Sequence, residues 1–129
     1  WAMAVPDGTP GADWSDADHG AAFAAFLTFV KANLAAQTAL RVDPGWASQT
    51  AVLQGIAGQM LPDAILREGE LAEGLAGIAR QIGRAAPALP AITDPHAARL
   101  RAISTPELER LSRDAYARDY AGFGFGDWG

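Results

Sequence analysis

The 129-residue chain contains no cysteine, only two histidines and a single lysine. The first two of these scarcities each exclude a kind of site. Without cysteine there is no disulfide, no thiolate metal site and no thiol nucleophile. Two histidines are too few for a histidine-rich metal site. The net charge is −5, and an acidic surface repels phosphate backbones. We therefore expect no nucleic-acid partner.

Several patterns that mark known sites are also missing. The sequence has no glycine-rich phosphate loop, no nucleophile elbow and no helix with paired histidines. No apolar run approaches the roughly 20 residues that a helix needs to cross a bilayer. We expect a protein without catalytic residues, metal, cofactor, small-molecule substrate or membrane span.

The amino-acid composition of the chain favours helix. Alanine is the commonest residue, hydrophobic residues make up 50% of the chain, and no segment is convincingly strand-like. A folded chain of this length is expected to form one domain and to bury about two-thirds of its unfolded surface. The sequence predicts an all-α fold, an irregular bundle of four or five helices over residues 15–121. An extended N-terminal arm (1–14) and a glycine- and aromatic-rich tail (122–129) flank it.

Two start signals predict the first two helices. Ser15 followed by Asp18 matches a capping box, and the helix is expected to reach about residue 40. Asp43 before Pro44 predicts a second start, because proline at the first helical position needs no amide donor. The apolar residues expected to face inward are Phe23, Phe26, Val30 and Leu34, then Trp46, Leu53, Ile56 and Met60.

Three further helices are expected in the second half. One covers part of 63–84, one lies near 94–103, and one lies near 105–121, where Thr105-Pro106 repeats the start signal and Gly122 is a natural stop. The inward residues are expected to be Leu71, Leu75, Ile78 and Ile82, then Leu100, Ile103, Leu108, Leu111 and Ala115. Glu109 and Arg113 have the favourable i,i+4 order for a surface ion pair.

Aromatic side chains lie near both ends of the chain. In the run 120–129 they alternate with glycine, which costs roughly 1 kcal/mol per helical position. These rings either cover grooves of the chain's own helices or dock onto another protein, for which aromatics are usual anchors. We predict docking. The candidate residues are Trp1, Trp14, Tyr120, Phe123, Phe125 and Trp128.

Asp16, Asp18 and His19 form the main alternative site. Carboxylates and imidazole can bind a metal ion, and this cluster would suit a small stand-alone metal- or ligand-binding protein or enzyme. Acidic residues in a first helical turn are also favoured by the helix dipole, so capping is the competing interpretation. Glu68, Glu70 and Glu73 form a second acidic group, which we interpret as a solvated helix face.

The beginning of the sequence suggests export. The chain starts at Trp1, and Ala2-Met3-Ala4 before Val5 has the small-x-small form that ends an export signal. We therefore expect a periplasmic protein, and a cytoplasmic interaction module is the alternative.

Four segments together resemble a known family. They are Ala2-Met3-Ala4, Asp7-Gly8-Thr9-Pro10, Phe26-Leu27-Thr28-Phe29-Val30, and Leu40-Arg41-Val42-Asp43-Pro44-Gly45-Trp46. The arrangement resembles the small (gamma) subunit of bacterial membrane-bound flavoprotein dehydrogenases that oxidise sugars and alcohols. The resemblance implies a non-catalytic subunit, with flavin and active site on a large subunit and haem c on a third. We therefore expect an accessory subunit that binds larger protein subunits.

Overall fold

The computed structural model describes residues 13–91 and 94–127, and these residues form six α-helices, one 3-10 helix and no strand. The elements are α1 (Asp16–Leu34), α2 (Gln49–Ala57), η1 (Glu68–Glu70), α3 (Leu71–Gln81), α4 (Ala97–Ile103), α5 (Pro106–Ala115) and α6 (Ala117–Phe123). The prediction of an all-α fold is confirmed.

Helix α1 begins as the sequence predicts and ends earlier. The Ser15 hydroxyl oxygen accepts from the Asp18 amide at 3.2 Å, and the Asp18 carboxylate accepts from the Ser15 amide at 3.0 Å. The helix stops at Leu34 and not near residue 40, because the Asn33 side chain binds the chain that follows. Its amide donates to Thr38 Oγ1 at 2.7 Å and to the Leu40 carbonyl at 2.8 Å.

The predicted helix start at Asp43-Pro44 is wrong. Asp43 instead closes a turn, in which its carboxylate accepts from the Gly45 amide at 2.7 Å. Proline followed by glycine favours such a turn over a helix. Helix α2 begins at Gln49, and the hydroxyl of Ser48 caps it. Trp46 therefore lies in the preceding loop, and its ring packs edge-on against Phe26 and Phe29 of α1.

The last predicted helix is two helices. Thr105 caps α5 through the Leu108 amide, and Pro106 occupies the first turn, as predicted. The backbone then leaves helical geometry at Tyr116, whose hydroxyl donates to the Trp46 carbonyl at 3.1 Å. Helix α6 continues through Gly122 and ends at Gly124, which has a φ of 61°. The predicted stop at Gly122 is therefore two residues early.

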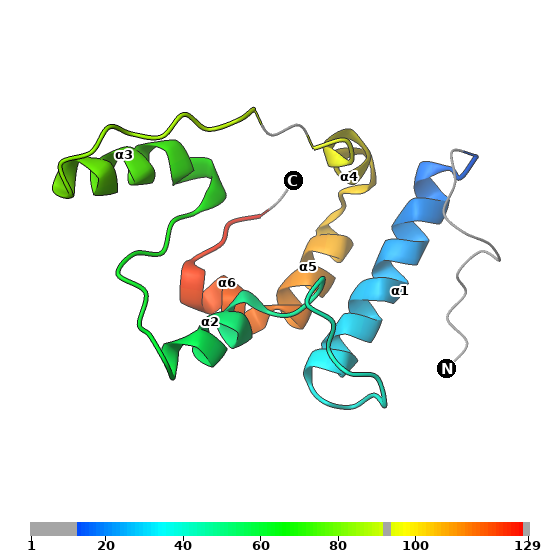
Figure 1. Cartoon of the computed structure of the whole chain (residues 1–129). Coiled ribbons are helices and arrows are strands. Elements are labelled where there is room, and N and C mark those ends of the chain that lie inside the picture. The colour runs from blue at the N-terminus through cyan, green and yellow to red at the C-terminus, as the bar shows by residue number, and fades with distance from the viewer. Residues whose placement is uncertain (1–12, 92–93, 128–129) are drawn as a thin grey trace.

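Helix α1 packs against α5 and against α4, and residues of these three helices form the hydrophobic core (Figure 1). Leu27, Ile103 and Leu108 are its buried centre, and Phe23, Ala24, Leu111 and Tyr116 pack around them. Helix α6 contacts α5, and α2 contacts α6. Helix α3 contacts only η1 among the elements of the described residues. Residues 49–91 thus lead away from the core and back; we call them the protruding segment.

Candidate functional site

A buried carboxylate attaches the start of the protruding segment to α6. Asp119 is only 3% exposed, and its two oxygens accept from the Gln49 amide at 2.8 Å and the Thr50 amide at 2.9 Å. These amides belong to the first turn of α2, where backbone donors lack helical partners and the helix dipole favours negative charge. Asp119 therefore caps α2 from 69 and 70 residues away in the sequence.

An arginine makes the second attachment, at the other end of α6. The Arg67 guanidinium donates to the carbonyl oxygens of Phe123 and Gly124, the latter at 3.3 Å. Carbonyls at a helix C-terminus lack partners within the helix and attract cations. Arg67 precedes η1 directly, so this contact fixes the base of α3 against the end of α6.

Large apolar side chains are exposed along the protruding segment. Those at least half exposed are Val52, Ile56, Met60, Leu61, Ile65 and Ile82. The prediction that Ile56, Met60 and Ile82 face a core is wrong, because all three side chains are more than half exposed. Among the described elements α2 contacts only α6 and α3 contacts only η1, and Met60 lies in the loop after α2. Phe26 and Leu100, also predicted to face inward, are 37% and 36% exposed.

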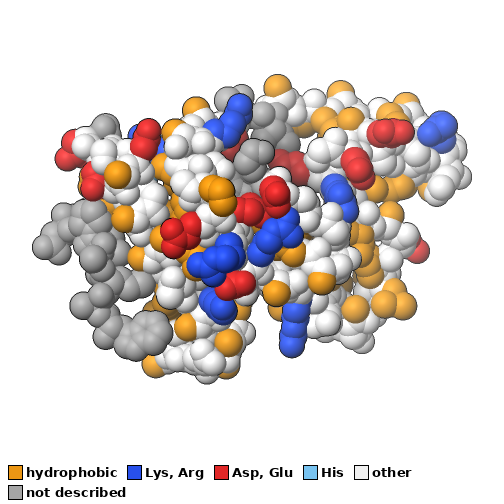
Figure 2. All heavy atoms as spheres, turned by 180° about the vertical axis from the view of Figure 1, so that it is seen from behind, with side chains coloured by type: hydrophobic (Ala, Val, Ile, Leu, Met, Phe, Trp, Pro, Cys, Tyr) orange, Lys and Arg blue, Asp and Glu red, His pale blue; other side chains and the backbone are white. Residues whose placement is uncertain are grey.

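The protruding segment is also poor in charge where its apolar residues are exposed. Residues 49–66 carry one charged side chain, Asp63, although 19% of the whole chain is charged. Figure 2 places the protruding segment on the right, where apolar side chains line the edge, and charged side chains gather over the middle of this face. Exposed apolar patches of this kind mark interaction surfaces.

The surface area of the chain supports the same conclusion. The chain exposes 9659 Å², whereas a folded monomer of 13.5 kDa exposes about 6,500 Å². The chain therefore buries about half of its unfolded surface, and not the expected two-thirds.

A groove lies where the protruding segment meets α6 and the tail; we call it the α6 groove. Its volume is about 870 Å³. Ile65, Leu66 and Leu71 line one side, and Phe123 and Phe125 line the other. The remaining lining residues are Gln49, Arg67, Glu68 and Gly122.

The structure brings three predicted docking residues together on α6 and the tail. The Phe125 ring lies 5.9 Å from the Tyr120 ring and 5.7 Å from the Phe123 ring. The Arg113 guanidinium lies 4.7 Å from the centre of the Tyr120 ring. All three rings are half-buried, so they contact their own helices and keep part of their surface accessible.

The other predicted docking residues do not join this group in the part of the chain that is described. Trp14 is half-buried at the start of α1, with its ring 5.4 Å from that of His19. Figure 1 shows that end of α1 away from α6. Trp1 and Trp128 lie outside the described residues.

The Asp16, Asp18 and His19 cluster serves the start of α1. The Ser15 hydroxyl donates to Asp18 at 2.6 Å, and this bond, with that from the Ser15 amide, lowers the pKa of Asp18. His19 contacts the Trp14 ring, and Asp16 is exposed in the first turn. Within residues 13–91 and 94–127, no group of three or more histidine, aspartate or glutamate side chains is placed to hold a metal ion.

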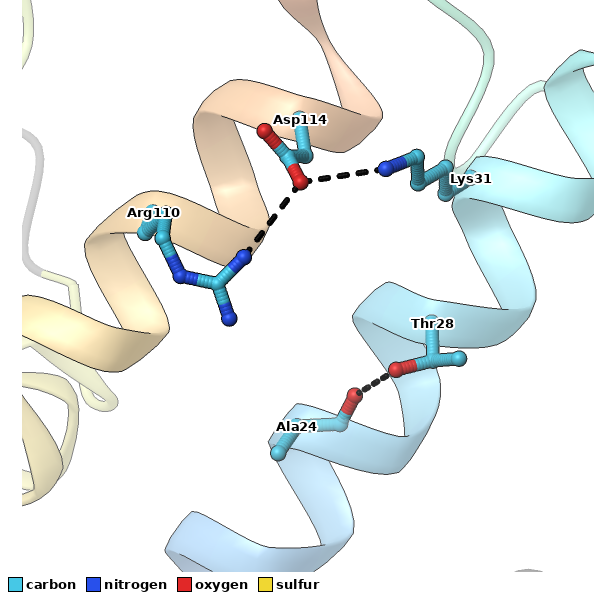
Figure 3. A network of polar contacts seen from close by, with 5 residues as sticks. All are labelled: Ala24, Thr28, Lys31, Arg110 and Asp114. Carbon is cyan, nitrogen blue, oxygen red and sulfur yellow. Dashed lines mark hydrogen bonds and ion pairs between the residues drawn. The ribbon is translucent and has the colours of Figure 1, made fainter.

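The charged side chains of α5 are used in surface ion pairs. Asp114 accepts from Lys31 of α1 at 3.0 Å and from Arg110 at 3.4 Å (Figure 3). The predicted pair of Glu109 and Arg113 is present at 3.1 Å. Arg113 also pairs with Asp127 of the tail, which raises the pKa of Arg113. These ion pairs join α1, α5 and the tail. Most of the exposed large apolar side chains lie elsewhere, on the protruding segment.

None of the helices in the described ranges is both long enough and apolar enough to span a membrane. No family model, no curated protein and no solved structure matches this chain. The surface of the protruding segment and the α6 groove are therefore the observations from which a function can be argued.

Proposed function

We propose that this chain is a non-catalytic accessory subunit that binds a larger protein through its protruding segment. The observation that carries the proposal is the row of exposed apolar side chains on a segment that the chain's own helices leave uncovered. Exposed large apolar side chains that gather on one segment commonly mark an interaction surface.

The size and shape of the surface favour a larger protein as partner. Permanent complexes bury roughly 1,000–2,500 Å² on each partner, and this chain exposes more surface than an ordinary folded monomer of its mass. The exposed side chains are spread over α2, the linker that joins α2 to η1 (residues 58–67), and the end of α3. A two-fold dimer needs one self-complementary patch, whereas a spread of this kind suits a segment that wraps a larger surface.

The sequence resemblance supplies a more specific proposal. The segments at 2–4, 7–10, 26–30 and 40–46 support an exported bacterial complex of the flavoprotein dehydrogenase type. In that proposal the partner is the large subunit, which holds the flavin and the substrate, and this chain contributes no catalytic residue. The small-x-small sequence at Ala2-Met3-Ala4 supports a periplasmic location.

Co-purification from the chain's own host tests the proposal. We expect the triple variant Ile56→Ser, Met60→Ser, Leu61→Ser to recover less than about one-tenth of the larger subunit, because each side chain is at least half exposed and free to anchor a partner. The matched control is Leu100→Ser on α4, which we expect to recover it fully. Circular dichroism should show unchanged helix content in both. Equal recovery of the larger subunit by the wild-type chain, the triple variant and Leu100→Ser would exclude the protruding segment as the binding surface.

A further inference from the structure

The α6 groove combines an apolar floor with an acidic edge. Five of its lining side chains are apolar, and they come from two parts of the chain far apart in sequence, 65–71 and 123–125. Phe123 and Phe125 are half-buried in contact with each other, so two rings are already positioned on one side. Preorganised aromatic surface in a groove is typical of the anchor pockets of protein interfaces.

The charges around the groove do not balance within the chain. Glu68 lines the groove, and Glu70 and Glu73 follow within the next turn and a half. All three are exposed, and none forms an ion pair within the described residues. The nearby Arg67 donates to the neutral carbonyls of Phe123 and Gly124 and keeps its positive charge. Arg67 and the three glutamates together carry a net charge of −2, so the edge beside the apolar floor remains net negative.

We infer that the α6 groove takes an apolar segment of the larger partner that is flanked by lysine or arginine. This inference rests on the proposed function and names the subsite and its ligand chemistry. Apolar side chains of the partner would contact Ile65, Leu71 and Phe125, and its basic side chains would face Glu68 and Glu70. Such complementarity selects the partner and sets the salt dependence of association.

A second copy of this chain is the competing occupant. Ile82 is exposed between Arg80 and Arg84, so it offers a similar apolar and basic combination. Seating it in a neighbour's groove would join the end of α3 to the base of the next α3. In that head-to-tail contact the groove of the last copy stays open, so further copies add and form rings or filaments. Most of the protruding segment would stay uncovered.

Site-specific photo-crosslinking in the host cell, with the full chain, separates these occupants. The photoreactive residue p-benzoylphenylalanine replaces Ile65 in the groove, Met60 in the linker outside it, or Leu100 on α4 as the control. Ile65 and Met60 are more than half exposed and Leu100 is 36% exposed, so we expect the fold to accept each substitution, which circular dichroism checks. Mass spectrometry then sequences the crosslinked peptide. We expect the Ile65 position to capture a larger protein through a peptide with apolar residues and lysine or arginine within a few positions.

A charge test accompanies the crosslinking. Glu68→Gln with Glu70→Gln should lower the yield at Ile65 by about fivefold at low salt and less at high salt, since each exposed charge pair contributes modestly. The matched control, Asp13→Asn before α1, should leave the yield unchanged.

The outcomes distinguish the inference from the proposed function. Capture at Met60 without capture at Ile65 would overturn the groove and leave the protruding segment as the binding surface. A crosslink from Ile65 to another copy of this chain, or to an acidic peptide, would overturn it as well. Absence of capture at both positions, or equal capture at Leu100, would overturn both proposals.

Discussion

Two buried polar side chains, Asn33 and Asp119, hold the end of α1 and the start of α2. Asn33 is 1% exposed and binds Thr38, Leu40 and the Trp46 indole, whose Nε1 donates to Asn33 Oδ1 at 2.9 Å. Asp119 caps α2. Buried polar groups are costly unless all their partners are present, so both residues hold their surroundings in one arrangement.

Asp119 and Asp114 should differ sharply in their effect on stability. We expect Asp119→Ala to lower the free energy of unfolding by about 2–3 kcal/mol, because two partly buried amides of α2 lose a charged acceptor. Asp114→Ala should cost less than about 1 kcal/mol, since its ion pairs with Lys31 and Arg110 are exposed. Urea denaturation followed by circular dichroism measures both. Similar losses in the two variants would show that Asp119 is not the critical cap.

The tyrosine in the break between α5 and α6 predicts a loss of stability at alkaline pH. Burial raises the pKa of Tyr116, and the charge of Asp119 raises it further. The folded state therefore favours the neutral phenol. Its contribution to stability is complete below the unfolded pKa of about 10 and is lost as the pH rises through the folded-state pKa.

Tyr116→Phe should make stability less dependent on pH in that range. At pH 8 the variant is expected to be less stable by about 1 kcal/mol, because the bond to the Trp46 carbonyl is lost. The difference from the wild-type chain should narrow between pH 10 and pH 12. Urea midpoints of both proteins at several pH values measure this difference in stability. A difference that stays constant from about pH 8 to about pH 12 would show that Tyr116 is not the group that causes the alkaline loss of stability.

Among the elements, those set by local chemistry could be predicted from sequence and those set by distant contacts could not. The capping box of Ser15 and the Thr105-Pro106 start act within one helical turn, and both are confirmed. The start of α2 has a local signal, the Ser48 hydroxyl that accepts from the Ala51 amide, and a distant one, the Asp119 carboxylate. The prediction from Asp43-Pro44 missed the Ser48 signal. The break at Tyr116 accompanies its bond to the Trp46 carbonyl, 70 residues away, and no local pattern encodes that partner, so the expectation of a continuous 105–121 helix was wrong.

Two glycines at the end of α6 provide an element-level test. Gly124 has a φ of 61°, and a Cβ there would lie 3.3 Å from the Arg67 guanidinium, so Gly124→Ala should cost about 1 kcal/mol. Gly122 lies inside the helix with no neighbour within 4 Å of such a Cβ, so Gly122→Ala should stabilise by up to about 1 kcal/mol. Thermal and urea unfolding compare the pair. Destabilisation by Gly122→Ala would favour the earlier helix stop predicted from sequence.

For the molecule as a whole, sequence identified apolar helix faces without showing what covers them. A period of 3.6 residues marks Ile56 and Met60 as one side of one expected helix and Ile82 as one side of the next. The pattern is the same whether the chain or a partner buries those sides. The same limit applies to Tyr120, Phe123 and Phe125, which contact their own helices and also line the α6 groove. The charge-poor run 49–66 is the sequence signal that distinguishes the protruding segment, because a surface facing water would carry more charge.

The surface left open should reduce the cooperativity and stability of the isolated chain. Unfolding exposes about 9,900 Å² instead of the roughly 13,000 Å² expected for this mass, so the urea m-value should be about three-quarters of that of an ordinary domain of equal length. Binding of the larger subunit to the folded chain alone should raise the melting temperature as its concentration increases.

Urea titration of the purified chain gives its m-value. Scanning calorimetry of the chain, of the complex and of the Ile56→Ser, Met60→Ser, Leu61→Ser variant gives the melting temperatures. The variant should melt close to the wild-type chain when alone, because its altered side chains are exposed, and it should gain little from the partner. Leu27→Ala in the core is the contrasting control, since it removes a buried side chain and should cost about 2–5 kcal/mol in every state. A full-sized m-value for the isolated chain, with no stabilisation by the partner, would mean that the protruding segment folds back onto the core in solution.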